Sequence, residues 1–165
     1  MVREPMDFAE FYTSAKDDCL RTVLASTGDM QAAEELVAEA LARAWAAWPT
    51  VSRHPAPRAW VVRTALNTGT TWWRRHAREL PLADYDAVVS GDQDGGLDAA
   101  VLVALRSLPS RQREVIALRV FLDMDTDEIA AQLGIAPATV RVHLARATAA
   151  LRQALSPAST QEVGQ

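Results

Sequence analysis

Apolar residues recur every three or four positions along most of the chain, and this period constrains the fold more than any other feature of the sequence. Phe8, Phe11, Ala15 and Cys19 begin the first such stripe, which ends before Gly28. This spacing places side chains on one face of an α-helix, whereas a half-buried strand requires alternation with a period of two. No strand-like alternation in the sequence runs long enough to compete. The sequence therefore predicts an all-α fold.

The helical period is interrupted once, which predicts two small helical domains. Residues 80–97 combine Pro81 and three glycines with acidic residues and show no period, a composition typical of a linker. We expect a first helical domain over residues 6–79, a flexible acidic linker over 80–97, and a second helical domain over 98–155. The tail, residues 156–165, is expected to fray.

Helix boundaries follow from prolines, glycines and capping residues. In the first domain, helices are expected up to Gly28, over about 31–48 and over about 58–76, with a loop over 49–57 because its three prolines disfavour helix.

In the second domain, a helix over 97–108 should stop at Pro109. Ser110 and Thr126 are candidate N-caps of the next two helices. Gly134 should end the short helix, and Pro137 should begin a long one.

The net charge of −4 is unevenly distributed. Residues 1–80 hold ten acids and ten bases, residues 81–98 hold five acids and no base, and residues 99–165 hold six acids and seven bases. The excess acid therefore lies in the linker and does not exclude a local basic surface that binds phosphate. Sixteen of the seventeen basic residues are arginine, which suits phosphate and guanine but also fits the composition of a GC-rich genome.

Residues 127–146, DEIAAQLGIAPATVRVHLAR, have the pattern of a helix-turn-helix. Gly134 permits the tight turn, while Val140 and Leu144 anchor the second helix against the first. The outward face combines arginines with short side chains, as a helix in the major groove requires: Ala138, Thr139, Arg141, Val142, Ala145 and Arg146. An ordinary helical hairpin with solvated arginines is the alternative.

Two further clusters have a functional and a structural interpretation. Aromatic residues stand next to basic residues over 72–78, which suits stacking on unpaired bases, although the tryptophans would equally serve a core and the arginines a solvated helix end. Glu35, Glu39 and Arg43 follow one another at intervals of four. They form either a protein-docking face or a solvated face with one intrahelical ion pair.

No catalytic, metal-binding or cofactor-binding constellation is visible in the sequence. His54, His76 and His143 stand alone, Cys19 has no partner, and no glycine-rich phosphate loop occurs. Neither a membrane span nor the apolar segment of a secretion signal is found. We therefore expect a cytoplasmic protein that is not an enzyme and needs no cofactor.

Taken together, these segments resemble the extracytoplasmic-function group of sigma-70 factors of RNA polymerase, in particular its actinobacterial sigma-E family. Residues 33–45 resemble region 2.2, residues 57–61, 67–68 and 72–75 resemble regions 2.3 and 2.4, and residues 108–115 with the helix-turn-helix resemble region 4. The resemblance extends from about Phe8 to Leu155.

The resemblance implies an alternative-sigma transcription initiation factor that binds core RNA polymerase, recognises −35 and −10 promoter elements and nucleates melting. It implies contact with the β′ clamp helices through Glu35, Glu39 and Arg43, and a further contact with the β flap. The implied −10 contacts are Arg63, Asn67, Thr71, Trp72, Arg74 and Arg75. The implied −35 contacts are Thr139, Arg141, Val142, Ala145 and Arg146. Whether an anti-sigma factor is a further partner stays open.

The chain departs from the family pattern in a few places. Many members carry glutamine at the position of Ala38, a serine–arginine pair at Val142 and His143, and a larger residue at Ala145. These departures leave the −35 sequence open. Two other classes of protein are alternatives to the interpretation as a sigma factor: a helix-turn-helix regulator that acts without core polymerase, and a helical protein-interaction adaptor that contacts no DNA.

Overall fold

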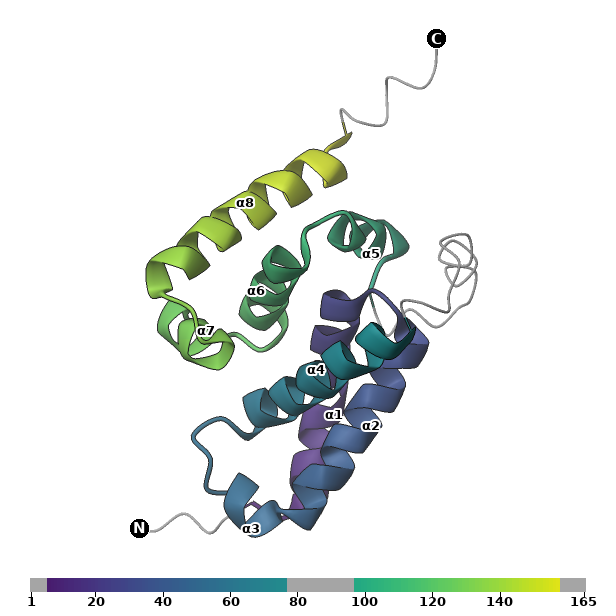
Figure 1. Ribbon diagram of the computed structural model, residues 1–165, viewed down its shortest axis with the longest axis vertical. Coiled ribbons are helices and arrows are strands. Elements are labelled where there is room, and N and C mark those ends of the chain that lie inside the picture. The colour runs from purple at the N-terminus through teal and green to yellow at the C-terminus, as the bar shows by residue number, and fades with distance from the viewer. Residues whose placement is uncertain (1–5, 77–96, 158–165) are drawn as a thin grey trace.

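The computed structural model describes the backbone of residues 6–76 and 97–157 and the side chains of residues 6–69 and 97–157. These ranges contain eight α-helices and no β-strand (Figure 1), so the predicted all-α class is confirmed. The predicted linker lies outside the described residues except for Leu97, as does the tail beyond Pro157.

The N-terminal half forms a bundle of three long helices and one short one. α1 (Phe8–Thr27), α2 (Met30–Ala46) and α4 (Pro57–His76) pack against one another, and α3 (Trp48–Val51) follows α2. The chain turns between α1 and α2 at Gly28, whose φ of +76° an L-residue with a side chain rarely adopts. The Gly28 N–H donates to the Leu24 carbonyl at 2.7 Å. The predicted end of the first helix before this glycine is confirmed.

The loop expected over residues 49–57 was wrong in part, because residues 48–51 form the single helical turn α3. Pro49 lies in the first turn of α3, where a backbone N–H has no helical acceptor and its loss costs nothing. Pro57 likewise begins α4. A proline therefore marked the start of a helix at both places.

The C-terminal half holds four helices, with the longest lying across the others. α5 (Ala99–Arg106), α6 (Ser110–Phe121) and α7 (Thr126–Leu133) are followed by α8 (Pro137–Leu155), which packs against all three (Figure 1). α5 is shorter than the helix expected over 97–108. It begins at Ala99 because Asp98 caps it by accepting the Ala100 N–H at 2.8 Å, and it ends at Arg106. The N-cap of α6 is Pro109, and Ser110 is its first helical residue, so the predicted Ser110 cap was wrong.

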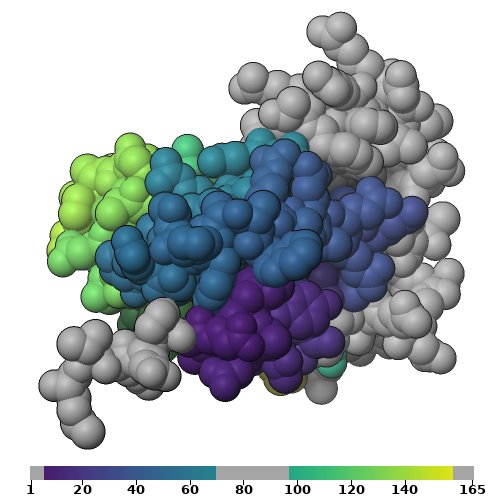
Figure 2. All heavy atoms as spheres, turned by 90° about the horizontal axis from the view of Figure 1, so that it is seen from below, coloured from purple at the N-terminus to yellow at the C-terminus, as the bar shows by residue number. Residues whose placement is uncertain are grey.

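The two halves pack directly on each other through α1, which contacts α5 and α6 as well as α2 and α4. Buried residues of both halves form one continuous cluster. Polar contacts among the described residues also join the halves: Arg106 donates through Nε (2.7 Å) and Nη2 to the Gly28 carbonyl, and Gln132 Nε2 donates to the Ala59 carbonyl at 2.8 Å. Viewed from below, the surface of α7 and the start of α8 (bright green) adjoins that of α3 and α4 (Figure 2).

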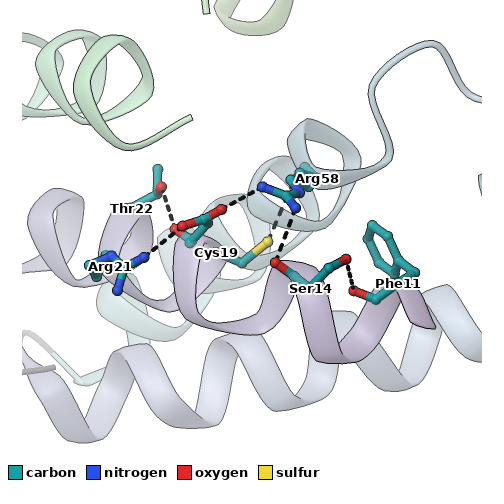
Figure 3. A network of polar contacts seen from close by, with 7 residues as sticks. Phe11, Ser14, Cys19, Arg21, Thr22 and Arg58 are labelled. Carbon is teal, nitrogen blue, oxygen red and sulfur yellow. Dashed lines mark hydrogen bonds and ion pairs between the residues drawn. The ribbon is translucent and has the colours of Figure 1, made fainter. Parts of the chain in front are cut away.

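Arg58 fastens the start of α4 to α1 (Figure 3). Its guanidinium forms an ion pair with Asp18 and donates to the Ser14 carbonyl at 3.0 Å. Asp18 also pairs with Arg21 at 2.6 Å. Below this network lies Cys19, where burial raises the pKa of the thiol to about 12 although the Arg58 charge opposes the shift. The Cys19 thiol is therefore protonated at neutral pH and is not a ready nucleophile.

We expect Gly28→Ala to destabilise the chain more than Gly134→Ala does. Both glycines have positive φ, so alanine at either should cost about 1 kcal/mol of backbone energy. A Cβ at Gly28 would lie 2.9 Å from Arg106 Cγ, whereas a Cβ at Gly134 meets nothing within 4 Å. The added displacement of Arg106 should cost about 1 kcal/mol more through its lost hydrogen bonds.

Urea unfolding monitored by circular dichroism measures the difference between the two variants. In an Arg106→Ala background, the additional destabilisation by Gly28→Ala relative to Gly134→Ala should disappear. If the two substitutions lowered the free energy of unfolding equally in the wild-type background, the Arg106 contact would not stabilise the packed halves.

Candidate polymerase and nucleic-acid interfaces

A capping box fixes the first helix of the helix-turn-helix. The Asp125 carboxylate accepts the Glu128 N–H at 2.8 Å, and the Glu128 carboxylate accepts the Asp125 N–H at 2.8 Å. Asp125 is therefore the N-cap, and the predicted cap, Thr126, is the first residue of α7. Either residue type suits an N-cap, so the backbone geometry had to decide between neighbours.

The turn and the second helix begin where the sequence predicts. Gly134 adopts φ +66° and ψ +36°, and the Ile135 N–H donates to the Ala130 carbonyl at 3.1 Å. Pro137 begins α8. Ile129 and Val140 are fully buried between the helices. This is the packing that holds a recognition helix at a fixed angle to its partner.

The first half of α8 presents one exposed face. All five residues predicted to contact the −35 element lie on it: Thr139, Arg141, Val142, Ala145 and Arg146. Within the described part of the chain, neither Arg141 nor Arg146 has an ion-pair partner. Both guanidinium groups are therefore available to phosphate or guanine. His143, in contrast, is half-buried and turned toward the core side of the helix.

The residues predicted to contact the −10 element are described only in part. Arg63 and Asn67 are exposed on α4, one helical turn apart. Thr71, Trp72, Arg74 and Arg75 belong to the last turns of the same helix, and their side chains lie outside the described residues. All six are therefore carried by one helix.

In the packed chain, Arg63 and Asn67 face the C-terminal half. They line a cavity of about 320 Å³ whose other wall includes Arg111, Glu114 and Gln132. Burial raises the pKa of the Glu114 carboxyl, and the Arg111 charge, 3.0 Å away, opposes that shift. A second cavity of about 590 Å³ lies beside it, lined by residues from Trp48 to Arg58 on one side and by α7 and the segment before it on the other.

The face of α2 predicted to dock on polymerase is solvent-exposed. Glu39 and Arg43 form an ion pair at 2.7 Å with about half of each side chain exposed, so the pair contributes only a few tenths of a kcal/mol to helix stability. Arg43 also reaches Thr68 of α4 at 3.4 Å. Glu35 is exposed one turn before Glu39.

Trp45 is the functional candidate that sequence reasoning missed. The apolar pattern allowed either Ala44 or Trp45 to face the core, and the structure buries Ala44 and leaves Trp45 68% exposed. The exposed Ala38 and Ala42 precede it on the same face at helical spacing. An exposed tryptophan among small residues is a frequent anchor of protein interfaces. The sequence signal that could have indicated this face is the i, i+4, i+7 spacing of Ala38, Ala42 and Trp45.

Two kinds of feature are absent from the described residues. In that part of the chain, no group of three or more histidine, cysteine, aspartate or glutamate side chains could hold a metal ion. No described helix is both long and apolar enough to cross a membrane.

Both halves of the chain match known protein families. Residues 11–79 match the family "Sigma-70 region 2", and residues 98–151 match "Sigma-70, region 4". The two matches follow one another in the order that the sequence motifs predict. They define the class as sigma factors of RNA polymerase.

Comparison with similar proteins narrows the family to which the chain belongs. It is 36% identical to RNA polymerase sigma-E factor of Streptomyces antibioticus, over 92% of this chain and 86% of that protein. It is 34% identical to ECF RNA polymerase sigma factor SigL of Mycobacterium tuberculosis, over 87% of this chain and 83% of that protein. The sigma factor RpoE of Bartonella quintana, solved in complex with the anti-sigma factor NepR, superposes with a TM-score of 0.74 at 26% identity, covering 90% of this chain and 96% of that one. The chain belongs to the extracytoplasmic-function group of the sigma-70 family.

We expect Asp125→Ala to lower the free energy of unfolding by about 1 kcal/mol, because it removes the oxygen that accepts the Glu128 N–H. Thr126→Ala should change it by less than about 0.5 kcal/mol, because Thr126 is not the cap. Thermal unfolding of both variants gives the comparison. A larger loss at Thr126 than at Asp125 would contradict the observed cap.

Proposed function

We propose that this chain is an alternative sigma factor that joins core RNA polymerase, recognises the −35 and −10 elements of a promoter and nucleates melting between them. The observation that carries the proposal is the ordered match to sigma-70 regions 2 and 4 over residues 11–79 and 98–151. We assign the two activities to domains over residues 6–79 and 98–155. The chain acts in the cytoplasm and performs no catalysis itself.

We assign −35 recognition to α8. Its exposed face carries Arg141 and Arg146, which suit phosphate and guanine, and Thr139, which suits either kind of base edge. Short side chains at Val142 and Ala145 let the helix approach the floor of the major groove. The buried contacts of Val140 and Ile129 support this assignment, because they set the helix on a rigid base.

We assign −10 recognition and melting to α4. Arg63 and Asn67 lead a series that continues through Thr71, Trp72, Arg74 and Arg75. Aromatic rings that stack on unpaired bases, with arginines on the backbone, stabilise a melted strand. Capture of an extruded base offsets the few kcal/mol lost on unpairing, so no nucleotide hydrolysis is needed to begin opening.

We assign polymerase docking to α2, with the β′ clamp helices as the partner of Glu35, Glu39 and Arg43. Trp45 joins this set, because it is the most exposed of the large apolar side chains described. The C-terminal domain is assigned a second contact, with the β flap. The relative from Bartonella quintana was solved with an anti-sigma factor, and we propose that a partner of this class also regulates this chain.

Run-off transcription tests the DNA contacts. With core polymerase and a genomic fragment that the wild-type holoenzyme transcribes, Arg141→Ala should lower the yield of transcript at least about fivefold through the lost guanine or phosphate contact. Asn67→Ala should lower it by a similar factor through weaker capture of the melted strand. Arg152→Ala is the matched control, because Arg152 is an exposed arginine in the last turn of the same helix. Full activity of both variants would contradict the assigned sites.

Affinity for core polymerase tests the docking face. The double charge reversal Glu35→Arg with Glu39→Arg should weaken binding about tenfold or more, because it places like charges against a complementary surface. Glu10→Arg with Asp17→Arg makes the same change of net charge on exposed positions of α1 and should leave binding within about twofold.

These measurements also separate the rival classes. A helix-turn-helix regulator would bind promoter DNA without core enzyme, and an adaptor would bind core without salt-dependent crosslinking to DNA. If wild-type protein had no measurable affinity for core at low salt, the sigma assignment would be wrong.

A further inference from the structure

The centre of the exposed α8 face is apolar. At about 100° per residue, Val142 lies roughly 160° around the helix from the fully buried Val140, so it points almost directly away from the hairpin core. Ala138 and Ala145 lie on the same ridge, one turn to either side, and both are exposed. Arg141 flanks this ridge on one side, and Arg146 flanks it on the other.

Val142 is 46% exposed in the free chain, although valine is among the residue types most often buried. Its β-branched side chain is stiff at χ1, so little rotamer freedom is lost when it is immobilised in a groove. Valine has no hydrogen-bond donor or acceptor. A base edge that offers only nitrogen and oxygen atoms would therefore lose its hydration against Val142 without a replacement partner.

The major groove offers one apolar feature, the 5-methyl group of thymine. We infer that the Val142 ridge of α8 reads a thymine methyl group at the centre of the upstream promoter element, with Arg141 and Arg146 contacting phosphate or guanine on either side. This inference rests on the proposed function, since it requires α8 to enter the major groove. It adds the chemical group that the exposed apolar ridge selects.

The consequence for specificity is a dependence on one carbon atom. Deoxyuridine keeps every hydrogen-bonding group of thymidine and lacks only the methyl group. Replacing the contacted thymine by uracil should weaken binding about fourfold, the ratio expected for losing the burial of one methyl-sized group. A hydrogen-bonding side chain at position 142 would not give this dependence.

The experiment uses the full chain bound to core polymerase. Holoenzyme first selects promoters from a random-sequence duplex library, and the most enriched duplex becomes the probe. Each thymine of its upstream element, on either strand, is then replaced singly by deoxyuridine, and the affinity of holoenzyme is measured by filter binding. Val142→Ala is compared with the wild type on every probe, because Val142 is exposed and alanine favours helix.

We expect one or two positions at which replacing thymine by uracil lowers the affinity of the wild-type holoenzyme about fourfold. At the same positions, the replacement should leave the affinity of the Val142→Ala holoenzyme unchanged. Arg141→Ala should bind all probes more weakly and keep the same sensitivity to uracil. If no uracil position matters, or if Val142→Ala retains the full sensitivity, the inference is overturned while sigma activity stands. If the holoenzyme enriches no upstream element at all, the proposed −35 function of α8 itself fails.

Discussion

The complete burial of the C-terminal part of α1 is the constraint on which the rest of this structure depends. Thr22 to Ser26 are five consecutive buried residues, so every face of the helix is covered there. A helix with one apolar stripe needs a single layer of partners, whereas one buried all round needs them on opposite sides. α2 and α4 supply one side, and α5 and α6 supply the other. The position of α4 relative to α8 follows from this arrangement.

Much of the fold was predictable, because local chemistry decided it. The period of the apolar residues gave the helices, and Gly28, Gly134 and Pro137 fixed three of their ends. The outward face of α8 could be assigned because Val140 and Ala147 had to be buried. Two of the boundaries that failed, at Ser110 and Thr126, each shifted by one residue where a neighbour took the N-cap position.

What could not be predicted depended on contacts between distant segments. The run from Thr22 to Ser26 could be read as the end of an amphipathic helix, and only α6, some ninety residues later, shows why its outer face is apolar. The exposure of Trp45 was ambiguous for a similar reason, since the pattern fitted Ala44 equally well. Arg63 and Asn67 face α6 and α7 only because the two halves pack together, so no local motif in the sequence could predict this orientation.

The contact of α1 with α6 also has a calorimetric consequence. Its interior is apolar, with Val23 and Leu24 of α1 in the same buried cluster as Val115 and Leu118 of α6. Separating the halves would hydrate that surface and so raise the heat capacity of the chain. A ligand that holds them apart would then show a less negative heat-capacity change on binding than its own contact area predicts. Its apparent affinity would also be reduced by the fraction of molecules that remain closed.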